Sequence, residues 1–262
     1  MKFGLRAAAL SAVLCGGALS VSACADNESM LFIVGVLAIE ETDCILSPQA
    51  SAVLRTGGVL DMSLRSSYTA GLLVGSQLTQ RGNRDQLRTE TARLAMRGAE
   101  VRLETAEGAP IAEFTTISSG FVHPASGTDP GYGALSAELI PAGAPLTPGV
   151  VVARISVFGD TLGGEEVQSN EFFFPIQICN GCLVDYPAEA SQPDQGPNIY
   201  LCDLQADMDA VSGDQACRVG QDVRVPCTAC AAQNPICRDP CLNCSTLLGG
   251  LDCTGSQPAN CP

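Results

Sequence analysis

The sequence contains no tryptophan, a single histidine and few aromatic residues, which make up 5% of its 262 residues. Basic residues are also scarce, since 14 lysines and arginines stand against 28 aspartates and glutamates and give a formal net charge of −14. Such an acidic chain is not suited to binding nucleic acid, or to adhering to anionic membranes through its bulk charge. The single histidine also leaves few options for acid–base catalysis.

Long hydrophobic runs are absent as well. The apolar stretches 7–19 and 30–39 are too short to span a bilayer as a permanent helix. The first follows Lys2 and Arg6 and ends in small residues, which is the order of a secretory signal peptide. We therefore expect residues 1–23 to be removed during export.

The end of this signal segment carries a second motif. Val21, Ser22, Ala23 and Cys24 are an aliphatic residue, two small residues and a cysteine, and they resemble the lipobox of bacterial outer-membrane lipoproteins. The resemblance implies cleavage before Cys24, a diacylglycerol on its sulfur and acylation of the new amine, which together suffice for stable anchoring. The alternative is an ordinary secretory signal, cut before Cys24 or before Asp26. Either interpretation makes the chain an exported one.

Anchoring at Cys24 would place the protein in the cell envelope, at the outer membrane, on its periplasmic or surface side. Residues 24–29 then form a short tether that reaches about 20 Å when fully extended. We expect the lipid to be the membrane contact and an envelope protein or polysaccharide to be the partner. Without lipid the protein would be secreted.

Residues 30–182 have the pattern of an all-β domain. Short apolar runs with period-two alternation are separated by turn signals, which gives about nine strands. This pattern predicts an antiparallel immunoglobulin-like β-sandwich. The two clearest runs predict these inward-facing positions: Val151, Ala153, Ile155, Val157, Phe172, Phe174, Ile176 and Ile178.

Three local features refine the expected sheets. The alternation changes phase at Gly98, which predicts a β-bulge. Gly57 and Gly58 lie between two apolar runs and predict a hairpin turn. Pro175 has no N–H to donate to a neighbouring strand, which predicts that its strand lies at a sheet edge.

Cysteine is the residue type in excess. Besides Cys15 in the signal and Cys24, the chain has an even number of cysteines, which in an exported protein predicts six disulfides. These cysteines are Cys44, Cys179, Cys182, Cys202, Cys217, Cys227, Cys230, Cys237, Cys241, Cys244, Cys253 and Cys261. After a linker at 183–200, residues 201–262 are expected to form a mostly irregular tail stapled by disulfides. The eleven cysteines from Cys179 onward are odd in number, so one of them must pair outside that set, and Cys44 is the only partner left. We expect Cys44 to pair with Cys179 or Cys182.

Two cysteine motifs also have metal or redox interpretations. Cys227, Cys230, Cys241 and Cys244 have the spacing of a zinc ribbon, but in an oxidising compartment this spacing favours disulfides. The pair Cys179 and Cys182 follows a strand, as a redox CxxC does. A redox pair needs a following helix that lowers a thiol pKa, and the sequence after Cys182 does not predict one.

Other candidate sites are weaker. The acidic segment 203–214 could bind calcium, but Val211 occupies a ligand position of the EF-hand pattern, so a solvated loop is favoured. His123 lies near Ser118, Ser119 and Asp129 in the sequence, although neither serine has the G-x-S-x-G surroundings of a nucleophile.

The leading functional expectation is a non-catalytic binding or structural module without cofactor or metal. The alternative is an exported enzyme, either a hydrolase that uses His123 or a thiol oxidoreductase that uses Cys179 and Cys182. A group of arginines is the candidate contact patch, with a solvated face as the other interpretation: Arg81, Arg84, Arg88, Arg93, Arg97 and Arg102.

Overall fold

The protein is described here from a computed structural model, which describes residues 30–39, 44–80, 90–185, 217–227, 230 and 237. Within these ranges the chain is essentially all-β, as the sequence predicts. Among the described residues, no helix is long and apolar enough to cross a membrane. Cys24, the signal segment and the acidic segment 203–214 lie outside the described residues.

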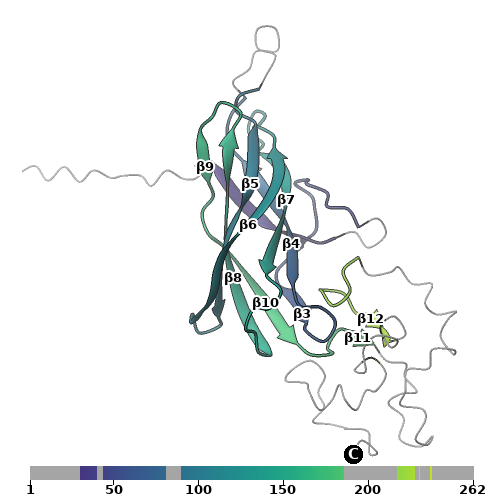
Figure 1. Ribbon diagram of the computed structural model, residues 1–262. Coiled ribbons are helices and arrows are strands. Elements are labelled where there is room, and N and C mark those ends of the chain that lie inside the picture. The colour runs from purple at the N-terminus through teal and green to yellow at the C-terminus, as the bar shows by residue number, and fades with distance from the viewer. Residues whose placement is uncertain are drawn as a thin grey trace, which may run out of the picture.

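Two curled sheets make up the body (Figure 1). The first sheet has its strands in the order β2 (Leu54–Arg55), β1 (Leu31–Leu37), β4 (Tyr68–Ser76) and β7 (Gly131–Ile140). The second sheet has the order β3 (Gly58–Asp61), β10 (Phe172–Cys179), β8 (Gly149–Thr161), β5 (Leu94–Thr105) and β6 (Pro110–Val122), with β9 (Glu166–Gln168) beside β8. All pairs within both sheets are antiparallel except β3 with β10.

One hydrophobic core lies between the two sheets. Leu72 and Leu135 reach it from the first sheet, and Val101 and Ile155 reach it from the second. The inward positions predicted for β8 and β10 are confirmed, because all are buried except Phe172, which is half-buried and packs against the same core. Period-two alternation locates this core because successive side chains of a strand point to opposite faces.

The predicted bulge in β5 is confirmed. The pairing of β5 with both β6 and β8 changes register between Met96 and Gly98. A Cβ atom at Gly98 would lie 2.2 Å from the carbonyl oxygen of Thr116, so only glycine fits there. The bulge leaves both Arg97 and Glu100 on the exposed side of the sheet.

The predicted hairpin at Gly57 and Gly58 is wrong. The strand before it, β2, belongs to the first sheet, whereas β3 belongs to the second, so the glycines carry the chain from one sheet to the other. A Cβ atom at Gly58 would lie 2.3 Å from the Tyr68 hydroxyl oxygen. Glycine is needed here for the close approach of a tyrosine and not for a tight turn between paired strands.

The edge position predicted for the Pro175 strand is wrong as well, because β10 lies between β3 and β8. However, β3 pairs only with Ile176–Cys179, and Pro175 lies just beyond this pairing. On that side, the missing N–H of the proline therefore interrupts no ladder.

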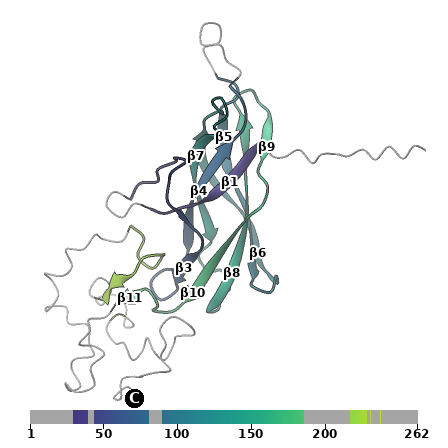
Figure 2. The ribbon, with the colours of Figure 1, turned by 180° about the vertical axis from the view of Figure 1, so that it is seen from behind.

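The described part of the tail completes the open edge of β3. The Asp61 N–H donates to the carbonyl of Gly220 at 2.9 Å, and the Asp222 N–H donates to the carbonyl of Val59 at 3.0 Å. Nearby, β11 (Val184–Asp185) pairs with β12 (Val225–Pro226) in parallel. Figure 2, which views the molecule from the side of β1, shows this small pair beside the β3 end of the body.

Three disulfides join pairs of described cysteines: Cys44–Cys217, Cys179–Cys182 and Cys230–Cys237. Cys227 is also disulfide-bonded. Cys44 bridges to the tail, but its expected partner was wrong. Cys179 and Cys182 pair with each other because the chain between them turns back through Gly181, whose φ is 76°. The remaining cysteines lie outside the described residues: Cys202, Cys241, Cys244, Cys253 and Cys261.

Candidate functional site

The outer face of the second sheet exposes large apolar side chains. Ile117 on β6 is 81% exposed, and Phe121 on β6 and Phe173 on β10 are each about half exposed. All three occupy outward positions, because the strands that carry them alternate between the core and this face. The face is therefore a surface on which apolar contact area is available to a partner.

An arginine side chain stacks on each of the two exposed phenylalanines. The Arg93 guanidinium carbon lies 4.4 Å from the Phe121 ring centroid, and that of Arg154 lies 4.7 Å from the Phe173 ring centroid. A guanidinium at this distance is attracted by the negative face of the ring. Arg154 also forms ion pairs with two carboxylates of the same face, Glu104 at 3.4 Å and Glu171 at 3.7 Å.

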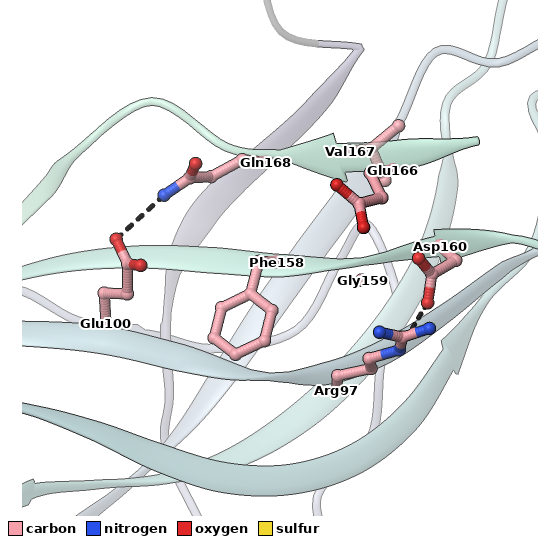
Figure 3. A pocket seen from close by; sticks show the side chains of 8 residues that line it. All are labelled: Arg97, Glu100, Phe158, Gly159, Asp160, Glu166, Val167 and Gln168. Carbon is pink, nitrogen blue, oxygen red and sulfur yellow. Dashed lines mark hydrogen bonds and ion pairs between the residues drawn. The ribbon is translucent and has the colours of Figure 1, made fainter.

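A hollow of about 470 Å³ lies on the same face, where β5, β8 and β9 run side by side (Figure 3). It is lined by Arg97, Glu100, Phe158, Gly159, Asp160, Glu166, Val167 and Gln168. The register explains this grouping, since Phe158 is opposite Gln168 and Asp160 is opposite Glu166. We call it the β9 hollow.

Two polar pairs flank the Phe158 ring in the β9 hollow (Figure 3). On one side, the Arg97 Nε forms an ion pair with Asp160 Oδ2. On the other, Gln168 Nε2 donates to Glu100 Oε2 at 2.9 Å. The Glu166 carboxylate points from β9 into the hollow, and no described residue forms an ion pair or hydrogen bond with it. Three carboxylates thus face a single guanidinium, and the hollow carries surplus negative charge.

The arginines expected to form a contact patch are only partly described. Arg81, Arg84 and Arg88 lie outside the described residues. Of the others, Arg93 covers Phe121 and Arg97 pairs with Asp160, and Arg102 lies 3.6 Å from Glu113. Each described member is therefore matched locally by an aromatic ring or a carboxylate, so the face has mixed charge.

The residues considered for hydrolysis are not joined to one another. His123 is exposed just after β6, and neighbouring Ser118 and Ser119 occupy alternating positions on that strand. No hydrogen bond or ion pair in the described ranges links the His123 imidazole to either serine. Asp129 instead pairs through its backbone with Ser126.

The Cys179–Cys182 disulfide is buried and is held by Asp61, a carboxylate with 0% exposure. Asp61 accepts hydrogen bonds from the N–H groups of Gly181 at 2.6 Å and Leu183 at 3.0 Å. It also accepts from the Ser63 N–H at 3.0 Å and the Ser63 hydroxyl at 2.5 Å. Potential ligand atoms of Asp61, Cys179 and Cys182 lie within 4.8 Å of one another. Because both sulfurs are in the disulfide, the site offers no thiolate to a metal.

A second polar cluster, which we call the tail clamp, fixes residues 218–222 to the body. The Tyr68 hydroxyl donates to Asp222 Oδ2 at 2.9 Å, and the Val59 N–H donates to Asp222 Oδ1 at 2.8 Å. Burial and the nearby Asp222 carboxylate raise the pKa of Tyr68 above its ordinary value of 10.0. The hydroxyl therefore remains a donor throughout the neutral range.

The rest of the tail clamp engages the backbone of Thr69 at the start of β4. Gln221 accepts from the Thr69 N–H at 3.1 Å and donates to its carbonyl at 2.7 Å. Arg218 Nη1 donates to the same carbonyl. Burial, assisted by the neighbouring Arg65, lowers the pKa of Arg218.

Replacing Tyr68 by phenylalanine should lower the free energy of unfolding by about 1–2 kcal/mol, since Asp222 loses a donor in a largely buried position. The raised pKa adds a pH signature. The stabilisation that the Tyr68 hydroxyl provides is complete below pH 10.0 and is lost as the pH rises beyond that value. Above pH 10.0 the tyrosine ionises in the unfolded chain while it stays protonated in the folded protein, which favours unfolding. Denaturant unfolding at rising alkaline pH should therefore show a steeper loss in the unmodified protein than in Y68F.

Tyr132→Phe is the matched control for this prediction, because it removes a hydroxyl from a half-buried tyrosine on β7 outside the tail clamp. It should change stability by less than about 0.5 kcal/mol. Equal losses in Y68F and Y132F would contradict the role of the tail clamp.

The sequence did not single out Asp61, Tyr68, Asp222 or Phe158. A charged residue inside the apolar run 58–62 was the one available signal for Asp61. Tyr68 and Asp222 are 154 positions apart, so no local pattern could have joined them.

No protein-family model matches this sequence, and no curated protein matches it either.

Proposed function

We propose that the protein is an exported lipoprotein of the bacterial cell envelope, anchored through Cys24, that acts as a non-catalytic binding or structural module near the outer membrane. The lipobox supports the anchor, and the short tether 24–29 would keep the body close to the bilayer. The proposal includes an immunoglobulin-like arrangement of the strands, supported by two mainly antiparallel sheets around one core.

The observation that carries the binding role is the outer face of the second sheet. It combines exposed Ile117, Phe121 and Phe173 with arginine–carboxylate pairs and the β9 hollow. Aromatic residues and arginine are the types that contribute most to protein interfaces. On β10, Phe173 alternates with Phe174 and Ile176, which are buried in the core, so Phe173 is presented on a well-packed strand.

The anchor is tested by the intact mass of the non-reduced protein extracted from its native membranes. We expect a chain that begins at Cys24 and carries diacylglycerol or more. A lipid-free chain beginning at Cys24 or Asp26 would make this a released protein and would overturn the envelope role.

The contact face is tested separately by photo-crosslinking in the producing cells. A benzophenone side chain placed at Ile117 should give a discrete higher-mass adduct. The same group at Glu107, which is exposed in the turn between β5 and β6, is the control and should give none. Adducts at neither position, or equally at both, would contradict a partner on this face.

A further inference from the structure

One phenylalanine of this face, Phe173, already has a guanidinium stacked on its ring within the protein itself. The Arg154 guanidinium lies over the Phe173 ring, while Glu104 and Glu171 provide its ion pairs. Ring attraction and carboxylate pairing act together there, because a guanidinium is planar and can stack and pair at the same time. Arg93 over Phe121 repeats the stacking part of this arrangement.

Phe158 also has carboxylates nearby, but no described guanidinium stacks on its ring. It is a third outward phenylalanine of the second sheet, with Glu100 on one side and Glu166, which lies opposite Asp160, on the other (Figure 3). Arg97, the arginine that lines the hollow, forms its ion pair with Asp160. No described cation lies over Phe158, whereas the described residues place one over both Phe121 and Phe173.

The net negative charge of the β9 hollow indicates the sign of the charge that its ligand carries. Once Arg97 has neutralised Asp160, the carboxylates of Glu100 and Glu166 remain. The whole chain carries a formal charge of −14, which attracts cations to this surface. The surplus charge therefore favours a cationic ligand and repels an acidic polysaccharide.

The geometry of the carboxylates argues against a bare metal ion. In the part of the chain that the structure describes, the one group of three potential ligands within 4.8 Å of one another is Asp61 with Cys179 and Cys182. The three carboxylates of the β9 hollow therefore do not converge on one point, because Asp160 and Glu166 lie opposite each other on one side of the ring and Glu100 lies on the other. Such a spread suits an extended organic cation.

We propose that the β9 hollow binds an arginine side chain from a basic segment of a partner protein. The guanidinium stacks on Phe158 and pairs with Glu166 and Glu100. This inference rests on the proposed binding role and names the chemistry of its partner. It does not depend on the lipid anchor, so the two can fail separately.

The absence of tryptophan from the sequence allows a direct experiment on the full-length protein. Phe158→Trp places the only tryptophan of the variant in the β9 hollow, and Phe121→Trp places one under Arg93 as the matched control. Emission is excited selectively at the tryptophan. Each variant is titrated at low ionic strength with a Gly/Ser heptapeptide that has one central arginine and blocked ends. The same peptide with citrulline, which keeps the shape and lacks the charge, is titrated in parallel.

We expect the arginine peptide to give a saturable change in the emission of F158W and no change in F121W. The citrulline peptide should bind F158W at least about threefold more weakly, since a cation over an exposed ring contributes modestly. Adding Glu166→Gln to F158W should raise the dissociation constant about threefold. Glu107→Gln, which changes the net charge equally at a distant turn, should leave it unchanged.

Several results would overturn the proposal. Equal binding of the citrulline peptide would make the hollow a neutral stacking site. Equal weakening by E107Q and E166Q would reduce the interaction to bulk charge. No saturable response in F158W, with both variants folded by circular dichroism, would remove the site.

Discussion

Replacing both Cys44 and Cys217 by serine is expected to lower the free energy of unfolding by about 3–5 kcal/mol. This disulfide closes a loop with a sequence separation of 173, so it restricts the unfolded chain more than a short bridge does. The tail clamp remains in the variant, but it must then hold residues 217–222 without the Cys44–Cys217 disulfide. Guanidinium unfolding of the oxidised protein measures the loss.

The Cys230–Cys237 bridge provides the control, because its sequence separation is only 7. The corresponding double serine variant should lose about 2–3 kcal/mol. A second readout is limited proteolysis, in which C44S/C217S should release tail fragments while the body resists. If the short bridge proves as stabilising as the long one, the entropic explanation of the Cys44–Cys217 bridge is wrong.

Asp61→Ala should destabilise the protein by about 3–5 kcal/mol. The change removes the acceptor of four hydrogen bonds, two of which come from the buried N–H groups of Gly181 and Leu183. Because these groups shape the turn that carries Cys179 and Cys182, the loss should extend to the end of β10. Urea unfolding, with hydrogen exchange at Gly181 and Leu183, measures both effects.

Asp129→Ala is a suitable control for D61A, since Asp129 is an exposed aspartate of the loop before β7. It should change stability by no more than about 0.5 kcal/mol. A loss below about 1 kcal/mol in D61A would indicate that water or a neighbouring group replaces the carboxylate.

The features that the sequence predicted well are those with a local cause. Alternation in β8 and β10 located the core because the side-chain period of a strand is fixed by its geometry. The phase change at Gly98 located the bulge for the same reason. A strand-level description therefore followed from short stretches of sequence, each considered alone.

The features that the sequence did not predict depend on partners that are distant along the chain. Gly57 and Gly58 have the composition of a hairpin, but Tyr68 makes them necessary. The partner of Cys44 is fixed by residues 220–222 docking on β3, which brings Cys217 close. The odd number of cysteines from Cys179 onward indicated that Cys44 must form a disulfide with one of them. The count alone cannot tell which one.

The β9 hollow shows the same limit at the level of a site. Its charges are visible in the sequence, but their grouping depends on how β5, β8 and β9 are aligned. Arg97 and Glu100 lie three positions apart, and simple alternation would place them on opposite faces. The bulge at Gly98 brings both to the outer face, so the hollow depends on one irregular residue.

The edge of β3 has a consequence for how the chain is made. Asp222, which covers this edge, follows Val59 by 163 positions. A chain that emerges with its N-terminus first therefore carries an open strand edge until synthesis has passed Asp222, and open edges recruit other strands. Production in a reducing cytosol would prolong this state, because Cys217 could not fix the covering segment to Cys44. Self-association through β3 would then compete with folding, and an oxidising export route would favour the monomer.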